Sequence, residues 1–293
     1  MTSPQQPSAP NRPAILERIL QAIDDHPPMP AFYRDLLPHI QDPDVGYEKL
    51  AAIIRHDPGV TMNILRMANT AYFSGTERID SLQQALVRLG SRRLLQIVIA
   101  HGVSTQLAVR LDGYGLEPRG LLLHSVGVAV TAGNLAHRLG LKMREMLFTA
   151  GLLHDMGKVV LDPFVEETRP FFDSLLRETD RPFDDLELEV LGISHPEAGS
   201  RLMARWNFPD DVVEIVAGHH HPDRSRVYPT EALMVHLADT LLYSQGVGDG
   251  IDGFRYAVAD DAAVRLGLRS RDVEQVASQS LDQLRELEAL MTM

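Results

Sequence analysis

The chain has 293 residues, no cysteine and a formal net charge of −12 at neutral pH. The lack of cysteine excludes disulfides, thiol catalysis and zinc–thiolate sites, so any metal must be bound by histidine and carboxylate groups. The acidic charge argues against a general affinity for nucleic acid or for anionic membranes.

The first twelve residues, MTSPQQPSAPNR, are rich in proline, glutamine and serine. This composition predicts a disordered tail over residues 1–12, and it lacks the basic and then apolar pattern of a signal peptide. No apolar run in the chain approaches the roughly 20 residues that a membrane span requires. We therefore expect a cytoplasmic protein that does not contact membranes.

Short helices are expected throughout the first half of the chain, residues 13–115. Apolar residues recur at helical spacing in four segments, residues 14–25, 32–40, 47–55 and 60–68. Ser81 has the character of a helix cap, and Gln84, three residues later, is placed to reach back to it. We expect that helix to end at Gly90, and Ser91 begins a strongly apolar helix.

A segment rich in glycine, DGYGLEP at residues 112–118, predicts a boundary between two lobes. Helices are predicted beyond it over residues 121–139, 143–153, 166–177, 185–191, 195–206, 210–217, 230–244 and about 270–290. No strand alternation and no internal repeat is found in the sequence. We therefore expect an all-α protein with a first lobe over residues 13–115 and a second over residues 116–293, which includes the closing helix.

The chemical signal lies in the second lobe. His154, Asp155 and Asp239 each lie within apolar sequence, in GLLHDMGK and VHLAD. Burying an ionised carboxylate alone is very costly, so such groups pair with a cation or bind a metal. An aspartate can bridge two cations, and imidazoles complete the shells of iron, manganese or zinc. Two such ions, about 3.5–4 Å apart, would polarise a phosphoryl group and generate a hydroxide nucleophile.

A structural interpretation competes with this one. Any single buried histidine or aspartate is more often a hydrogen-bonded core residue than a metal ligand. We assign that structural role to seven histidines, His26, His39, His56, His101, His137, His221 and His236. The case for the other histidines depends on the order in which they follow one another.

The order His124, then His154-Asp155, then Asp239 resembles the H…HD…D signature of the HD phosphohydrolase superfamily. With His195, His219 and His220 added, the set is similar to the ligands of the HD-GYP cyclic-di-GMP phosphodiesterases. The first half resembles the HDOD (HD-related output domain) family, through the segments PMP at 28–30, IRHDP at 54–58, LRMANTAYF at 65–73 and IDSL at 79–82. This resemblance extends over roughly residues 27–244.

The resemblance implies an all-helical HDOD-type fold whose second lobe is an HD-superfamily helical bundle. It implies seven metal ligands, namely His124, His154, Asp155, His195, His219, His220 and Asp239. The first metal would be held by His124, His154, Asp155 and Asp239, and Asp155 would bridge to a second metal on the remaining three histidines. Lys158 matches the lysine of the HDxGK pattern and would lie near a substrate phosphate, so Lys158 and Asp155 are the candidate catalytic residues.

Two functions remain open at this stage. The first is a bacterial signalling protein that binds one or two divalent ions (Fe, Mn or Zn), with a partner protein or a small phosphorylated ligand. The alternative is a metal-dependent phosphodiesterase or phosphatase acting on a nucleotide or cyclic dinucleotide. The GYP signature is incomplete at Val227-Tyr228-Pro229, which weakens cyclic-di-GMP as the substrate, and the sequence leaves iron-based sensing and the oligomeric state open.

Overall fold

The computed structural model of the protein describes residues 11–29, 47–55, 58–73, 78–248, 250–256 and 261–291. Across these ranges every regular element is a helix, apart from an isolated β-bridge between Leu111 and Leu116. The predicted all-α class is therefore confirmed. No helix in the described ranges combines the length and the apolar character needed to cross a membrane.

Several predictions fall wholly or partly outside the described residues, among them the structural roles assigned to His39 and His56. The predicted helix over residues 32–40 lies outside them, as do residues 1–10 of the predicted tail. Arg12 already belongs to the first helix, α1 (Arg12–Asp25).

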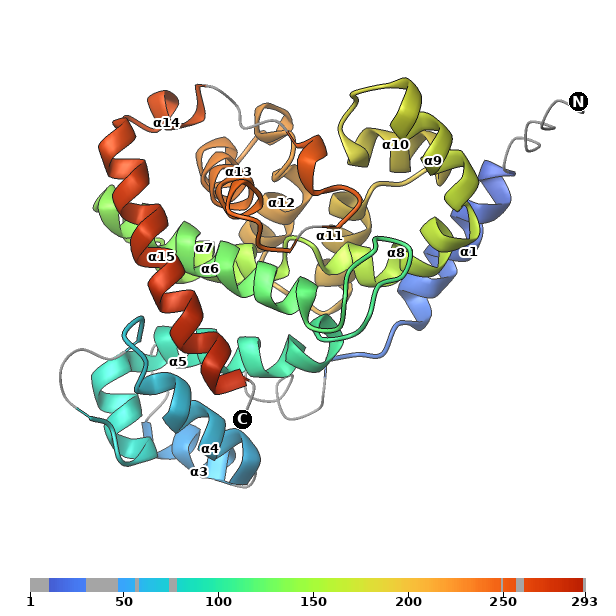
Figure 1. Ribbon diagram of the computed structural model, residues 1–293. Coiled ribbons are helices and arrows are strands. Elements are labelled where there is room, and N and C mark those ends of the chain that lie inside the picture. Colours follow the sequence, from blue (N-terminus) through green and yellow to red (C-terminus); the bar gives the residue numbers. More distant parts are fainter. Residues whose placement is uncertain are drawn as a thin grey trace, which may run out of the picture.

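The first lobe contains α3 (Tyr47–Arg55), α4 (Pro58–Ala68) and α5 (Leu82–Leu107), which gather at one end of the molecule (Figure 1). Its core includes the fully buried side chains of Leu50, Ile54, Ile64 and Leu86. The predicted cap of α5 is present, because Ser81 Oγ accepts from Gln84 N at 3.2 Å and Gln84 Oε1 accepts from Asp80 N at 2.8 Å. The predicted break at Gly90 is also present, as a residue with φ 73° that kinks α5.

The second lobe is built around α6 (Gly120–Arg138), which packs against α7 (Arg144–Leu153), α13 (Pro229–Ser244) and α15 (Ser270–Met291). Further helices surround these, namely α8 (Met156–Glu167), α9 (Arg169–Glu178), α10 (Phe183–Val190), α11 (His195–Arg205), α12 (Asp210–Gly218) and α14 (Ala262–Arg265). Two 3₁₀ turns, η1 (Pro222–Arg224) and η2 (Gly253–Arg255), lie in the connections. Because α6 is covered on most sides, nearly all of its residues from Leu121 to Ala136 are buried.

Helix α8 differs from the sequence prediction, which placed no helix between residues 154 and 165. The helix runs from Met156 to Glu167 although it contains Pro163, and a separate α9 follows at Arg169. Proline removes a backbone donor and glycine favours other conformations, so the local sequence indicates a break. Packing of α8 against α11 and α1 overrides that local preference.

The two ends of the described chain connect the parts of the molecule. Helix α1 packs against α8 and α11 of the second lobe through Ile15, Ile19 and Ile23, and Arg18 donates two hydrogen bonds to Glu167 at 3.0 and 2.8 Å. Helix α15 packs on α6 and reaches α4 of the first lobe, as its course in Figure 1 shows. The first helix of the chain therefore lies with the second lobe.

Candidate metal centre

The seven predicted ligands come from five places in the second lobe. His124 is on α6, His154 and Asp155 form the junction of α7 and α8, and His195 begins α11. His219 and His220 directly follow α12, and Asp239 lies in the middle of α13. All seven side chains converge on one buried region, although residues 124 and 239 are 115 positions apart.

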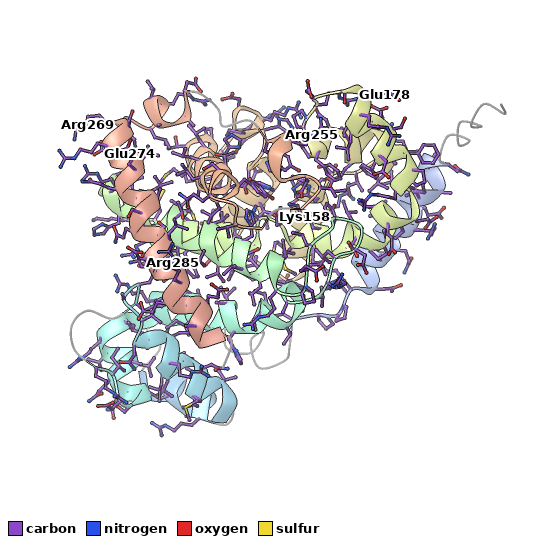
Figure 2. All side chains as sticks on the ribbon, in the orientation of Figure 1. Lys158, Glu178, Arg255, Arg269, Glu274 and Arg285 are labelled. Carbon is purple, nitrogen blue, oxygen red and sulfur yellow. The ribbon has the colours of Figure 1, made fainter. Side chains whose placement is uncertain are left out.

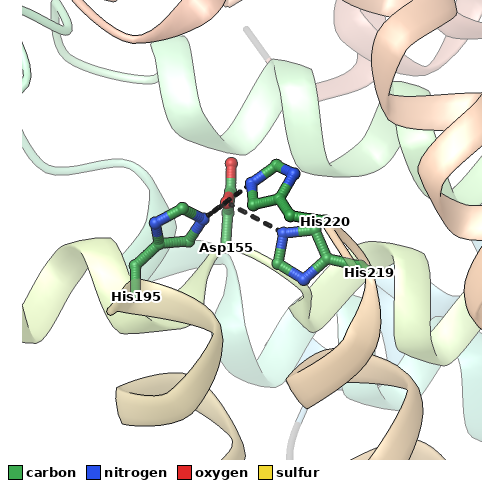
Figure 3. A group of neighbouring side chains, drawn as sticks. All are labelled: Asp155, His195, His219 and His220. Atoms are coloured by element: carbon green, nitrogen blue, oxygen red, sulfur yellow. Dashed lines mark hydrogen bonds and ion pairs between the residues drawn. The ribbon is translucent and has the colours of Figure 1, made fainter. Parts of the chain in front are cut away.

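The ligand atoms form two groups. One contains His124, His154 and Asp239, and the other contains Asp155, His195, His219 and His220; within each group the candidate ligand atoms all lie within 4.8 Å of one another. Figure 3 shows the second group, with the three imidazoles arranged around the Asp155 carboxylate.

The carboxylate of Asp155 faces both groups. Its Oδ2 lies 3.2 Å from His154 Nε2 and 3.7 Å from His124 Nε2. Its Oδ1 lies 3.3 Å from His195 Nε2 and 3.9 Å from His219 Nε2. One oxygen therefore faces each group, which is the arrangement that a bridging carboxylate requires.

The other ring nitrogen of each of four histidines is held by the protein. His124 Nδ1 donates to Val247 O at 3.0 Å, and His154 and His219 Nδ1 donate at 2.7 Å to Gly151 O and Val216 O. His195 Nδ1 donates to Glu187 Oε2 at 2.8 Å. Such partners fix the tautomer and direct the Nε2 lone pair inward, as in known metal sites.

Several inward-facing atoms have no hydrogen-bond partner among the described residues. These buried atoms are His154 Nε2, Asp155 Oδ1, His219 Nε2, His220 Nδ1 and Asp239 Oδ2. Buried polar atoms are nearly always paired, so five orphaned atoms in one cluster require an explanation. A cation coordinated by these atoms supplies it, and the donor set of imidazole and carboxylate fits iron, manganese or zinc.

The buried charges around the candidate ligands also favour the binding of cations. Four buried carboxylates surround the cluster, those of Asp155, Glu187, Asp239 and Asp252, and one buried ammonium group faces them, that of Lys158. An excess of three negative charges in a buried region is strongly unfavourable unless protons or metal ions offset it.

The pKa values of two histidines show how protons offset this charge. Burial lowers the pKa of His154, but the carboxylates of Asp155 and Asp239 outweigh it and raise the pKa to about 10. Burial also lowers the pKa of His195, but the carboxylates of Glu187 and Asp155 outweigh it and raise the pKa to about 9. In the absence of a cation both imidazoles therefore hold a proton at neutral pH.

The pKa values of His219 and His220 are instead lowered. Burial, together with the charges of His154 and His195, lowers the pKa of His219 to about 3. Burial and the neighbouring histidines also hold the pKa of His220 well below its usual value. Both rings are thus neutral at physiological pH, which is the form that binds metal.

Lys158 lies inside the second lobe, whereas residues such as Arg269 and Glu274 lie at its edge (Figure 2). Its Nζ is 2.8 Å from Asp155 Oδ2 and 2.5 Å from Asp252 Oδ2, and it donates to Tyr243 OH at 3.0 Å. The ammonium group thus neutralises carboxylates of the protein, and its predicted position at a substrate phosphate stays a prediction.

Sequence reasoning missed Glu187 and Asp252. Glu187 accepts from His195 N at 2.6 Å, from His195 Nδ1 and from Tyr114 OH at 2.6 Å. Neither residue stands out locally, because Glu187 is one of four acids in FDDLELEV and Asp252 lies in a glycine-rich connection.

A covering segment, residues 246–248 and 250–256, lies over the cluster. Gly248, with φ 81°, approaches so closely that an added Cβ would lie 2.5 Å from His124 Cβ, so only glycine fits there. Tyr256 stacks on His220, with ring centroids 3.7 Å apart and an interplanar angle of 8°. As a result six of the seven predicted ligands are at most 1% exposed, and His220 is 8% exposed.

Comparison with known proteins places these features in context. The family model for the HDOD domain matches residues 26–222. The structure of a protein from Shewanella amazonensis SB2B, called a "Putative phosphohydrolase", has a TM-score of 0.71 at 25% identity and covers 92% of this chain and 97% of that one.

Two curated relatives are similar over shorter stretches. An uncharacterised protein of Treponema pallidum is 26% identical over 204 residues, which are 69% of this chain and 39% of that protein. Ribonuclease Y of Thermus thermophilus is 35% identical over 136 residues, 46% of this chain and 18% of the enzyme. The chain thus matches well under half the length of these relatives.

Proposed function

The chain belongs to the HDOD family, as its motifs predicted, and on this premise we propose that it is a bacterial signalling protein whose second lobe binds two divalent metal ions. The observation that carries the proposal is the position of Asp155, with one carboxylate oxygen facing each group of ligand atoms. A purely structural aspartate in this core would need only Lys158 as its partner.

The two groups would divide the ligands as the resemblance implies. His124, His154 and Asp239 would hold one ion, with Asp155 as the shared ligand, and the three histidines of the other group would hold the second. Iron, manganese and zinc all suit these donors, and metal supply and geometry select among them. The first lobe would then transmit the state of the centre to a partner protein.

Metal analysis of protein purified without chelator tests this function. We expect about two ions per chain in the wild type and a large loss in Asp155→Asn, because that variant weakens both groups. His137→Ala is a matched control, since this exposed histidine lies on α6 outside the cluster. Fewer than about 0.2 ions per chain, or an unchanged content in Asp155→Asn, would contradict the proposal.

A second candidate function is hydrolysis of a nucleotide phosphoester. Similarity to Ribonuclease Y and to the Shewanella protein called a "Putative phosphohydrolase" favours it. Divalent ions bound in the centre would act as Lewis acids toward a phosphoryl oxygen. Lys158 would hold Asp155 in its bridging orientation. Access would require Tyr256 to leave its stacked position on His220, because both rings line a pocket of about 390 Å³ beside the cluster.

Turnover assays decide between the two functions. The substrates are bis(p-nitrophenyl) phosphate, cyclic-di-GMP and a short RNA, each with added manganese or iron(II). The hydrolase function predicts a rate above that of His154→Ala, and a further increase in Tyr256→Ala if the tyrosine limits access. If the wild type and His154→Ala had equal rates while the wild type still bound metal, the hydrolase function would be excluded. Of the two functions, only signalling would then remain.

A further inference from the structure

A third group of possible metal ligands lies outside the two groups of the candidate centre. It contains Asp184 and Asp185 from the first turn of α10 and His221 from the short connection between α12 and η1. One candidate ligand atom from each of the three residues lies within 4.8 Å of the other two. The sequence analysis predicted none of them as a ligand and assigned His221 a structural role.

His221 and Asp184 form a close pair. His221 Nε2 donates to Asp184 Oδ2 at 2.7 Å and lies 4.0 Å from Asp185 Oδ1. The backbone of His221 is held on both sides, since its N–H donates to Gly218 O at 3.0 Å and its carbonyl accepts from Arg224 N at 2.9 Å. A pair of this kind also occurs without metal, so it does not by itself indicate a site.

The second oxygen of Asp184 is not explained by this pair. Asp184 is 4% exposed, and its Oδ1 is buried without a hydrogen-bond partner among the described residues. Burial raises the pKa of Asp184, but the hydrogen bond from His221 outweighs it and lowers the pKa, so the carboxylate is ionised at neutral pH. A buried charged oxygen without a partner is strongly unfavourable. A cation at Oδ1 would supply the missing partner.

The same arrangement is found in the group of His124, His154 and Asp239. There His124 Nε2 lies 2.9 Å from Asp239 Oδ1, and Asp239 Oδ2 is again a buried oxygen without a partner among the described residues. In both places an imidazole nitrogen contacts one oxygen of an aspartate and leaves the other oxygen unpaired. The third group therefore has the features from which the metal centre itself was inferred.

The third group differs from the other two in being open to solvent. Asp184 and His221 line the pocket of about 390 Å³ that His220 and Tyr256 also line. The side chains of His221 and Asp185 are 28% and 32% exposed. Waters or a ligand in the pocket can therefore complete the coordination shell of an ion that the protein holds with three residues.

From these observations we propose that Asp184, Asp185 and His221 bind a third divalent cation, and that two carboxylates with one imidazole favour manganese(II). The site is separate from the proposed two-ion centre, because none of its residues belongs to either ligand group of that centre. It is nevertheless adjacent, since His221 directly follows His220, and Asp184 lies one turn before Glu187 on α10. Because the site is partly exposed, its ion is lost during purification and returns when manganese is added.

Titration of the wild type with manganese(II), with the free ion measured by electron paramagnetic resonance, tests the site. We expect about one more bound ion per chain than in Asp184→Asn, and the same loss in His221→Gln, which changes a partly exposed side chain. Asp223→Asn is the matched control, because Asp223 lines the same pocket but is exposed and pairs with Arg265. An equal loss in Asp223→Asn would overturn the proposal, and so would wild-type binding in both Asp184→Asn and His221→Gln.

Asp155→Asn distinguishes this site from the two-ion centre. We expect that variant to keep the additional ion while the ion content of the centre falls, because Asp155 is not a member of the third group. A wild type that binds a single manganese ion, lost in Asp184→Asn and kept in Asp155→Asn, would support the third site and contradict the two-ion centre. Loss of the additional ion in an Asp155→Asn variant with wild-type circular dichroism would assign that ion to the centre and overturn the proposal.

Discussion

Glu187 is not a predicted ligand, but it orients His195 in the group that also contains Asp155, His219 and His220. It holds both the backbone N–H and the Nδ1–H of His195 and receives the hydroxyl of Tyr114. In Glu187→Gln the amide can still accept one bond, but the charge that orients the imidazole is lost. We expect the affinity of the group that contains His195 for a metal ion to fall by about 10- to 100-fold.

Competition with a chromogenic chelator measures this loss. Glu189→Gln is the matched control, because Glu189 lies on the same helix, pairs with Arg181 and is half exposed. The inferred role of Glu187 would be wrong if both variants released metal at the same chelator concentration.

Protonation of His154 and His195 should make the proposed metal binding depend on pH. Their pKa values of about 10 and about 9 mean that each imidazole must lose a proton before it can bind a metal ion. Affinity should therefore rise with pH through the neutral range, and binding should release protons. The raised pKa values stabilise the metal-free fold fully below about pH 6.5, and this contribution is lost as pH rises toward 9–10.

Calorimetry of metal binding in buffers of different ionisation enthalpy counts the released protons. We expect about two per chain at pH 7. An apparent enthalpy that is the same in every buffer would show that the imidazoles are already neutral, and would contradict the pKa values.

The candidate ligands were predictable from sequence, whereas the residues that orient them were not. His154, Asp155 and Asp239 stand out because ionisable side chains interrupt apolar helices. Glu187 lies among other acids and Asp252 lies in a loop, so neither has a local signal. Their importance arises only when the fold brings Glu187 to His195 and Asp252 to Lys158.

At the level of helices, the close contact of α8 with α11 depends on Gly157. A Cβ at Gly157 would lie 1.9 Å from His195 O and 2.7 Å from Gly199 N, both backbone atoms that cannot move aside easily. Gly157→Ala should therefore lower the free energy of unfolding by about 3 kcal/mol or more and displace His195.

Urea denaturation measures this effect, with Gly120→Ala as the control. A Cβ at Gly120 would meet only side-chain atoms of Leu116 at 3.6 and 3.8 Å, so its stability should change by less than about 0.5 kcal/mol. Similar stabilities of the two variants would show that the backbones of α8 and α11 can separate at little cost.

The contact between α8 and α11 at Gly157 also explains why the sequence analysis did not predict α8. Gly157 and Pro163 both lower the intrinsic helix propensity of residues 156–167. The spacing of the apolar residues in this segment is not regular enough to predict a helix despite them. Gly157 nevertheless allows α8 to approach α11 closely. The same residue therefore lowers the predicted helix propensity of α8 and makes its packing possible. The helices α3 and α15, which depend on apolar spacing alone, were predicted almost to the residue.

At the level of the whole molecule, the candidate ligands lie where several packed helices of the second lobe meet. The candidate ligands come from α6, the α7–α8 junction, the start of α11, the end of α12 and the middle of α13. Without cations, an excess of buried negative charge lies at the meeting point of these helices. Bound metal should therefore stabilise the second lobe as a unit.

Removal of metal tests this last expectation. A ligand present at about a hundredfold above its Kd stabilises the fold by about 2.7 kcal/mol, and for a chain of this size each kcal/mol corresponds to roughly 2–4 °C. Treatment with a chelator should thus lower Tm by roughly 5–10 °C, and added manganese or zinc should restore it. Asp239→Asn removes one buried charge and one ligand, so its Tm should respond less to the chelator. If the wild type and Asp239→Asn melted at the same temperature with and without chelator, the cluster would owe its stability to its own protons and Lys158 rather than to metal.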